Sequence, residues 1–411
     1  MNKNISLLFL IFYLATTILP GFAAIDRIAF HWLYVSVLNA ISVIWIIFSG
    51  DSRTLFLPLK NNFSHKIFIT FFLVCIISLF YSINLDESLI NIKRLFILFV
   101  SLLSINYHVN SIQNISKVLS VVLILLIVEA FLPLKKFVEI IIATGGYNFS
   151  FANDLETFAP NKNITAAILT IHLGLIFYFT TLNKKLYNIL IYLLVFACSI
   201  SIILISSRAM ILSLIISFLA IIFTHLFYKT KFNFQVFRYF GIVIISSFLI
   251  NFYLGTKNDV SLNNRLTTLN TEDQSTNQRL RFYVHGINHI IENPIIGVGL
   301  GNWKLKSVEY ESPKMLSYIV PYSLHNDFLQ YGTEIGIIGM LIYLFLFIYI
   351  IYTNFLCFKK NYFLSISLLI SSITFFIDSN LNFPHQRVSM MILFILIIVL
   401  TDMNKKLFIN G

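Results

Sequence analysis

Long apolar runs separated by short polar stretches repeat along almost the whole chain. A helix needs roughly 17 to 25 mostly apolar residues to cross the hydrocarbon core of a bilayer. About twelve runs have that length, with approximate limits at residues 5 to 24, 28 to 49, 66 to 84, 89 to 107, 117 to 133, 163 to 181, 186 to 204, 208 to 227, 237 to 255, 333 to 355, 362 to 378 and 387 to 402. The pattern predicts an all-α, polytopic membrane protein.

The composition agrees with that prediction. Hydrophobic residues make up 58% of the chain and charged residues only 11%, with 42 phenylalanines. This much apolar surface cannot be hidden in one water-soluble core, so we interpret residues 1 to 411 as a single integral membrane domain. The first run follows Lys3 and ends near Gly21-Phe-Ala-Ala24, as a signal peptide would. Its length, and the second run that follows almost at once, favour a first span.

Basic residues predict the orientation of the spans. If the N-terminus is placed in the cytoplasm, one side of the membrane collects cations in every second short loop, namely Lys3, Arg53, Lys60, Lys66, Lys117, Lys184, Lys185, Lys229, Lys231, Arg238, Lys359, Lys360, Lys405 and Lys406. Cytoplasmic loops favour such cations, whereas a long loop such as residues 256 to 323 translocates regardless of charge. Both termini are therefore predicted to be cytoplasmic and the long loop external. Much of the net charge of +11 is this topology signal, so no nucleic-acid partner is expected.

The long external loop contains two kinds of sequence. Thr256 to Gln278 is rich in Asn, Thr, Asp and Ser, which predicts an exposed connection. Residues 278 to 291 then place apolar side chains at helical spacing, and Pro294 with the glycines of Gly297-Val-Gly-Leu-Gly301 ends the run. We expect a short amphipathic helix followed by a turn. The glycine run closes a helix and does not follow a strand, so it is no dinucleotide fingerprint.

Several charged and titratable residues lie near the predicted external ends of spans. These are Lys93 and Arg94 in the fourth run, Arg208 at the start of the eighth, Arg279 and Arg281 at the start of the amphipathic helix, and His325 within Ser323-Leu-His-Asn-Asp327. Charges at a span are costly unless they are paired or hydrated, so a set on one side of the membrane predicts a functional site. Snorkelling to lipid headgroups is the alternative for any single one of them.

An ordered series of motifs runs through residues 160 to 345. It consists of Asn161-Lys-Asn-Ile-Thr-Ala-Ala167, Ser207-Arg208-Ala209, Arg279-x-x-x-Tyr283, Pro294 with Gly297-Val-Gly299, His325-Asn326 and Glu334-x-Gly336-x-x-Gly339. Their order and spacing resemble the O-antigen ligase and O-antigen polymerase superfamily of bacterial membrane glycosyltransferases. The resemblance implies a multi-pass protein of the bacterial inner membrane that acts in lipopolysaccharide biosynthesis. Its site would face the periplasm and move a glycan from undecaprenyl diphosphate to an acceptor hydroxyl.

The residue types suit that chemistry. Breaking a bond between an anomeric carbon and a diphosphate leaves negative charge on phosphate oxygens, which guanidinium groups bind with two parallel hydrogen bonds. Arg208 and Arg279 are the candidates for this role. A His that titrates near neutral pH accepts the proton of the attacking hydroxyl, and His325 is the candidate base. Direct attack inverts the donor configuration and needs no pair of carboxylates.

The remaining candidates are predicted to bind substrate or to orient the three catalytic residues. Substrate-binding roles are predicted for Arg281, Lys93, Arg94, Asn326, Glu334 and Arg387. Asp327 and Glu334 would orient His325 or cap a broken helix, whereas His385 and Arg387 would line the entrance for the acceptor. We expect no cofactor and no metal. The chain lacks an Asp-x-Asp motif, which argues against a nucleotide-sugar enzyme that holds a diphosphate through a divalent ion.

Other interpretations of single clusters stay open. His285, His289 and Glu292 lie at i, i+4 and i+7, so one helical face also offers metal ligands. Glu129 and His172 lie inside spans, where they form either a proton path or an interhelical hydrogen bond, and the hydrogen bond is the commoner role.

Two classes of function fit the whole chain. A glycosyltransferase would use a lipid-linked glycan donor and take lipid A-core, another lipid-linked repeat or a protein hydroxyl as its acceptor. A transporter or flippase of lipid-linked sugars is also commonly built from about twelve spans, but it should concentrate polar residues at the bilayer midplane between related halves. Here the charges gather towards the external rim and the halves show no similarity, which favours the enzyme. Overall length and the compact segment around His325 favour a ligase over a polymerase.

Overall fold

The computed structural model describes residues 3–20, 26–112, 114–159, 161–181, 185–255, 274–312 and 322–410. Within these ranges the protein is helical, and ten helices are long and apolar enough to cross a membrane. Two shorter apolar helices, at the positions of the first and ninth predicted runs, accompany them. Each of the twelve predicted runs thus corresponds to an apolar helix. The predicted class, an all-α polytopic membrane protein, is confirmed.

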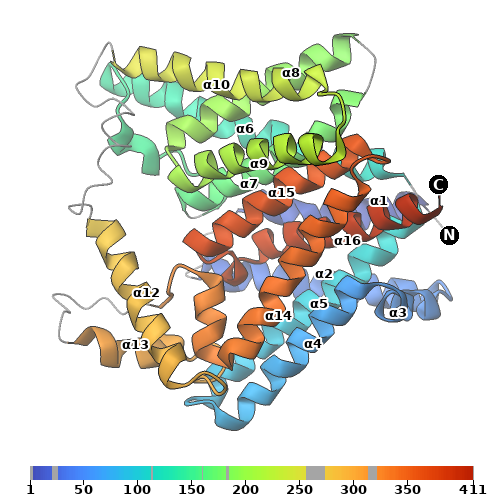
Figure 1. Cartoon of the computed structure of the whole chain (residues 1–411), viewed down its shortest axis with the longest axis vertical. Helices are drawn as coiled ribbons and strands as arrows, with labels where there is room; N and C mark the ends of the chain where they lie inside the picture. The colour runs from blue at the N-terminus through green and yellow to red at the C-terminus, as the bar shows by residue number, and fades with distance from the viewer. Residues whose placement is uncertain are drawn as a thin grey trace.

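The apolar helices follow one another along the chain with short connections. They are α1 (Lys3–Leu14), α2 (Arg27–Phe48), α4 (Phe63–Ile77), α5 (Leu85–Ile112), α6 (Ile115–Thr144), α7 (Lys162–Ile176), α8 (Lys185–Ile205), α9 (Arg208–Tyr228), α10 (Phe234–Gly255), α14 (Asp327–Cys357), α15 (Tyr362–Leu381) and α16 (Val388–Asn410). The other helices are α3 (Ser52–Asn61), α12 (Gln274–Glu292), α13 (Trp303–Glu311) and the short 3-10 turns η1 (Ala15–Thr17), η2 (Ser78–Tyr81), η3 (Phe149–Asn153), η4 (Phe177–Thr181) and η6 (Pro384–Gln386). Both termini lie at one end of the molecule, and α12 and α13 lie at the opposite end (Figure 1).

Three helices form the centre of the bundle. α7, α15 and α16 are buried on nearly all sides, whereas the other spans expose a broad apolar face, as lipid-facing helices do. α7 and α15 approach closely because small residues meet there. The Ser371 hydroxyl donates to the Ile171 carbonyl over 3.0 Å, and a Cβ on Gly174 would lie only 2.6 Å from the same hydroxyl oxygen. Small residues are the usual means by which membrane helices pack closely.

The first half of the chain contains one wrongly predicted boundary and one helix that was not predicted. The fifth run was expected to end at residue 133 and a loop to follow to 162, but α6 continues through Pro133 to Thr144. Proline is tolerated inside membrane helices because neighbouring groups satisfy the backbone it leaves free. α3 was not predicted. It is a ten-residue amphipathic helix that buries Leu55 and exposes Phe56, so its apolar residues are too few to register as a span.

The segment between α10 and α14 contains the predicted helix and turn. α12 covers the amphipathic stretch, and the glycine-containing turn follows it. α13 is an additional short helix. The predicted polar connection falls mainly on residues 256–273, which lie outside the described ranges, as do residues 313–321 of the same predicted loop.

α14 begins at Asp327, ahead of the predicted start at residue 333, and it is interrupted at Gly336. The backbone of Gly336 has φ +78°, and a Cβ there would lie 2.2 Å from the Ile295 carbonyl oxygen, so only glycine fits. The turn after α12 bonds to the interruption: the N–H of Val298 donates to the Thr333 carbonyl and the N–H of Gly299 to the Glu334 carbonyl. The segment between α10 and α14 is thereby bonded directly into a broken membrane helix.

Candidate functional site

The first turns of α12 lie against the ends of two other elements. Arg279 donates from Nη1 to the carbonyl of Leu381, the last residue of α15, over 3.1 Å. One turn further along α12, the Tyr283 hydroxyl lies 3.1 Å from two carbonyl oxygens, those of His325 and Asn380. The predicted pair Arg279 and His325 is therefore brought together by the end of α15 and the residues before α14.

His325 has an unusual backbone and an incompletely bonded ring. Its φ of +55° is in the left-handed region, which is uncommon for a residue other than glycine. Its N–H donates to the Ser323 hydroxyl, and its ring meets Phe383 edge-on with centroids 4.9 Å apart. Nδ1 is buried and has no hydrogen-bond partner among the described residues. A buried ring nitrogen in that state is a feature of sites that bind or react with a ligand.

The surroundings of His325 keep its imidazole neutral. Burial lowers its pKa to about 4, and the nearby positive charge of Arg279 acts in the same direction. At neutral pH the ring is therefore uncharged and able to accept a proton. Asn326 caps α14, because its side-chain oxygen accepts the N–H of Leu329 over 3.0 Å, and its role in substrate binding stays a prediction.

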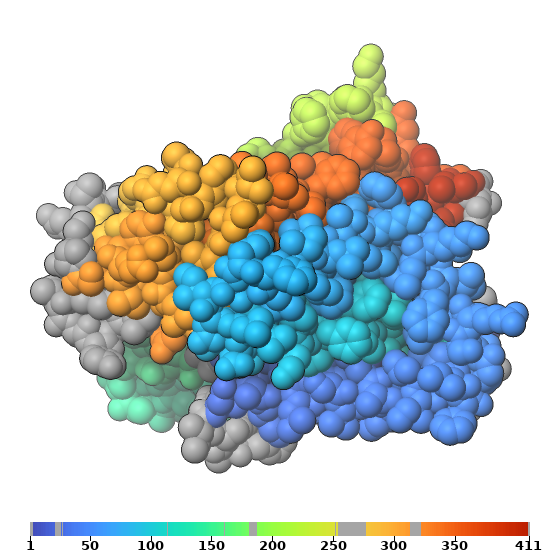
Figure 2. Space-filling model, turned by 90° about the horizontal axis from the view of Figure 1, so that it is seen from below, coloured from blue at the N-terminus to red at the C-terminus, as the bar shows by residue number. Residues whose placement is uncertain are grey.

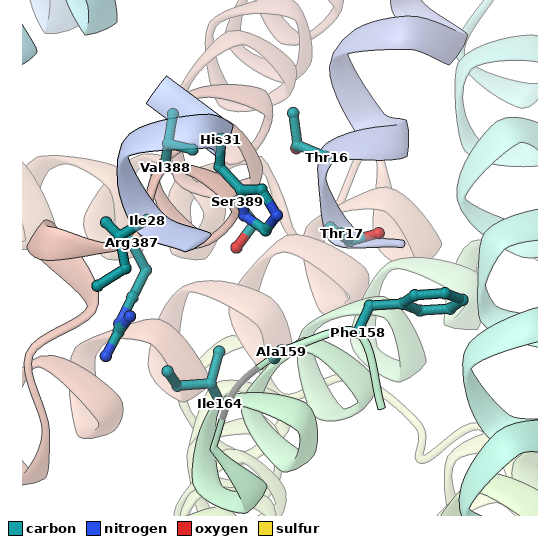
Figure 3. A pocket seen from close by; sticks show the side chains of 10 residues that line it. All are labelled: Thr16, Thr17, Ile28, His31, Phe158, Ala159, Ile164, Arg387, Val388 and Ser389. Atoms are coloured by element: carbon teal, nitrogen blue, oxygen red, sulfur yellow. The ribbon is translucent and has the colours of Figure 1, made fainter. Parts of the chain in front are cut away.

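Arg387 contacts the same aromatic ring as His325. Its guanidinium lies over Phe383, with 5.6 Å between the guanidinium carbon and the ring centroid. Burial lowers the pKa of Arg387, and Asp26 partly offsets this effect. Arg387 also borders a small pocket with His31, in which the guanidinium extends away from the imidazole (Figure 3). The pocket volume is only about 20 Å³, which suits a water molecule and not a substrate.

Arg208 and Lys93 have less defined surroundings. Arg208 is exposed as the first residue of α9, after a turn in which Ser206 has φ +52°. Lys93 is exposed on α5, next to the half-buried Arg94. Their predicted roles in catalysis and binding stay predictions.

Arg281 forms an ion pair with α13. Its guanidinium donates to both carboxylate oxygens of Glu311, over 2.7 to 3.1 Å, and the hydrogen bonds to Glu311 raise its pKa. His285 approaches the same carboxylate at 3.0 Å, and His289 bonds to the Tyr310 hydroxyl. The two His residues considered as metal ligands thus face α13, and the described part of the chain contains no cluster of three metal-ligating side chains.

Arg94 and Glu334 line a larger cavity of about 520 Å³ at the same end of the bundle. Its walls come from α2, α5, the turn before α13, the first part of α14 and η6. The segment around residue 300 lies side by side with the helices of residues 63 to 112 (Figure 2), and the Ile83 N–H donates to the Val298 carbonyl. Six acidic or basic side chains line the cavity, namely Arg94, Lys304, His385, Asp26, Glu87 and Glu334.

Glu334 anchors one wall of this cavity. Its carboxylate accepts the N–H of Gly301 over 2.7 Å, the N–H of Trp303 over 3.4 Å and the amide of Gln330 over 2.5 Å. Glu334 was predicted to bind substrate, and also to orient His325 or cap a broken helix. These contacts place its carboxylate at the broken helix, and its role in substrate binding stays a prediction. The carboxylate ties the turn before α13 to α14, just before the interruption at Gly336.

Sequence analysis did not predict the pair formed by Asp327 and His385. The His385 Nδ1 lies 2.5 Å from one carboxylate oxygen of Asp327, and its backbone N–H donates to the other. Burial opposes protonation of His385, but the carboxylate outweighs it and raises the pKa. His385 was predicted only to line an entrance. Phe383, which His325 and Arg387 share, was also missed, because no sequence signal connects the loop before α16 to the start of α14.

Glu129 and His172, inside the bundle, are hydrogen-bonded over 2.7 Å. The structure thus shows the interhelical bond that was the commoner of their two predicted roles.

Comparison with known proteins tests the predicted resemblance. Residues 193–344 match the model of the family described as O-antigen ligase, and no curated protein matches the chain. The match contains Arg208, Arg279 and His325 but ends before His385 and Arg387 and begins after Arg94. Members of that family are glycosyltransferase-like enzymes of O-antigen processing. The match over residues 193–344 supports the O-antigen ligase superfamily, which the ordered motifs of this region predicted.

Proposed function

We propose that this protein is an O-antigen ligase, which transfers a glycan from undecaprenyl diphosphate to a sugar hydroxyl of lipid A-core. The observation that carries the proposal is the Arg279 guanidinium beside a neutral His325 imidazole, within the segment that matches the family. The pair supplies a cation for the leaving group and a base for the attacking group. Both belong to elements at the end of the molecule opposite the termini.

The leaving group is a diphosphate monoester on the lipid carrier. As the bond between the anomeric carbon and the phosphate oxygen breaks, its electron pair passes to that oxygen. Arg279 stabilises the developing charge, since a guanidinium has five N–H donors and its described contacts use one. In this proposal Arg208 and Arg387 contribute further positive charge to the same group. No metal is required for this step.

The attacking group is a sugar hydroxyl. Its oxygen bonds to the anomeric carbon while its proton passes to a ring nitrogen of His325, and the configuration at the anomeric carbon inverts. A pKa of about 4 would make the free imidazole a weak base. A diphosphate bound at Arg279 adds negative charge nearby, so binding of the donor raises the pKa of His325 toward the working pH. The base is thus strengthened only when the donor is present.

Topology supports a periplasmic location for this site. The distribution of basic residues predicts cytoplasmic termini, and α12 lies at the end of the molecule opposite the termini (Figure 1). We propose that the protein is a multi-pass component of the bacterial inner membrane with cytoplasmic termini, and that its 160-to-345 region forms the core of one membrane domain.

A deletion strain separates the candidate functions by the appearance of its lipopolysaccharide on a gel. Loss of a ligase leaves rough lipopolysaccharide and accumulates lipid-linked polymer, whereas loss of a polymerase leaves core that carries a single repeat. Normal lipopolysaccharide with a defect in solute uptake would contradict both and favour the transporter. Purified protein should transfer glycan in the presence of EDTA, since the proposed reaction uses no divalent ion.

A further inference from the structure

We propose that the 520 Å³ cavity is a carbohydrate site, in which Trp32 and the His385–Asp327 pair contact a saccharide. This inference rests on the proposed function, because it assigns the binding of a sugar substrate to a region separate from the diphosphate. The volume lies within the range of about 300 to 1,000 Å³ that is usual for small-molecule sites. The family match covers only part of its walls, since Trp32, Arg94 and His385 lie outside it.

The charges of the cavity are balanced. Lys304 forms an ion pair with Glu87 over 2.7 Å, and Arg94 lies near Asp26 and Glu87. The protonated form of His385 is paired with the Asp327 carboxylate behind it. A diphosphate would meet three carboxylates here without a surplus of cations. A neutral saccharide instead finds both hydrogen-bond donors and acceptors among the lining side chains, which suits its hydroxyl groups.

Trp32 supplies a flat apolar surface and an unsatisfied donor. The indole is 5% exposed and lines the cavity, with the guanidinium of Arg94 5.6 Å from the ring centroid. Its Nε1–H is buried and has no hydrogen-bond partner among the described residues. A buried donor without an acceptor is costly, and a bound hydroxyl oxygen would satisfy it. The C–H face of a sugar ring packs on an aromatic ring in the manner of other apolar surfaces.

His385 is held in one orientation on the opposite part of the wall. Because Nδ1 is bonded to Asp327, Nε2 is the ring nitrogen that remains for a ligand. Asp327 is fully buried and also binds the backbone N–H of His385, which fixes the imidazole through two contacts. These contacts prepare His385 to donate a hydrogen bond to a sugar oxygen.

Only a thin wall separates this cavity from the proposed catalytic pair. Phe383 contacts the ring of His325, and His385, two residues further on, lines the cavity. A second connection runs through Asp327, which follows His325 by two residues and bonds to the ring of His385. We infer that a glycan bound in the cavity extends one of its hydroxyls or its anomeric end past these residues to His325.

Binding can be tested without any assay of transfer. The probes are the core oligosaccharide released from lipid A by mild acid and the repeat-unit glycan released from undecaprenyl diphosphate. Each is titrated into the full-length protein in detergent while tryptophan fluorescence is recorded. Trp45→Phe is the matched control, since Trp45 lies on the same helix but packs against Phe9 and His108 and does not line the cavity.

We expect a saturable fluorescence change with one of the two probes, kept in Trp45→Phe and lost in Trp32→Phe. A change with the core oligosaccharide makes the cavity an acceptor site, and a change with the repeat unit makes it a donor-glycan site. In transfer assays Trp32→Ala should raise the KM of that same substrate about tenfold, with kcat within about twofold. The substrate whose KM changes must be the one that gives the fluorescence signal.

The proposal is overturned if neither probe changes the fluorescence, or if the change persists in Trp32→Phe. Failure of the proposed function gives a different result: wild-type protein that binds a probe through Trp32 but transfers no glycan would remove the ligase assignment and keep the carbohydrate site. Wild-type protein that transfers glycan but gives no signal with either probe would remove the carbohydrate site and keep the ligase assignment.

Discussion

The edge formed by Arg279, His325 and Arg387 differs in charge from the neighbouring 520 Å³ cavity. At the edge, the Arg279 guanidinium lies near a neutral imidazole, and no carboxylate pairs with Arg279 among the described residues. The Arg387 guanidinium packs on Phe383, the ring that His325 also contacts. In the cavity, three carboxylates offset three cationic groups. The two regions share a wall made by η6 and the start of α14. The difference indicates that the protein separates binding of a charged leaving group from recognition of an uncharged sugar.

The largest effect should follow from removing the base. His325→Ala takes away the proton acceptor, and general bases contribute about 10²- to 10⁴-fold to a rate, so we expect kcat/KM to fall about a thousandfold. The level of the variant in the membrane and its thermal midpoint should stay near those of wild type, because the ring makes one described aromatic contact and leaves Nδ1 unbonded. Transfer within about threefold of wild type would remove His325 from the mechanism.

Arg279→Gln should cost about a hundredfold in kcat, in line with the loss of one charged donor from a transition-state site. It should also change the response to pH. In wild type the imidazole is neutral above a pKa of about 4, so kcat/KM falls only as the pH drops through that value. Removal of the neighbouring positive charge raises this pKa toward 6.5, though burial, the larger cause, still keeps it below.

The acid limb of the kcat/KM profile of Arg279→Gln should thus lie at higher pH than that of wild type. A profile that loses activity but keeps the wild-type acid limb would show that Arg279 and His325 are not electrostatically coupled. His289→Gln on the same helix is a useful control, because His289 faces Tyr310 and its loss should leave the limb unchanged.

An intermediate effect on KM is expected from changes to Asp327 and His385, which lie in the wall between the two regions. Asp327→Asn weakens the bond to the His385 ring, and His385→Gln removes the ring itself, so each should raise the KM of the saccharide substrate about tenfold. Because the two residues act as one unit, the double variant should be no worse than either single variant. Additive losses in this cycle would mean that Asp327 acts on His325 separately from His385, and the separation of the two regions would then be incomplete.

Periodicity and composition predicted most of the bundle, because a span of apolar residues is a property of local sequence. They gave the wrong helix limits where contacts with other helices decide the structure. Examples are α6, which continues through Pro133, and α14, which begins earlier than its apolar run. The motif series named Arg279 and His325, and the structure places them together. It did not reveal Asp327–His385 or the cavity beside Trp32, since these depend on contacts between segments far apart in the chain.

The smallest effect on activity should come from Arg281, which was predicted to bind substrate but is bonded to Glu311. Arg281→Ala leaves a nearly buried carboxylate without its bidentate partner, so the free energy of unfolding should fall by about 1–3 kcal/mol while KM stays within about twofold. The thermal midpoint in detergent reports the loss, and Glu311→Gln in the same background should recover part of it.

Lys306→Ala provides the matched control, because Lys306 pairs with the exposed Glu309 on α13 and such a pair contributes at most about 0.5 kcal/mol. A large rise in KM with an unchanged thermal midpoint would instead place Arg281 among the substrate-binding cations. The cationic edge would then extend along α12 beyond Arg279, and the charge difference between the two regions would be larger than the described ion pairs indicate.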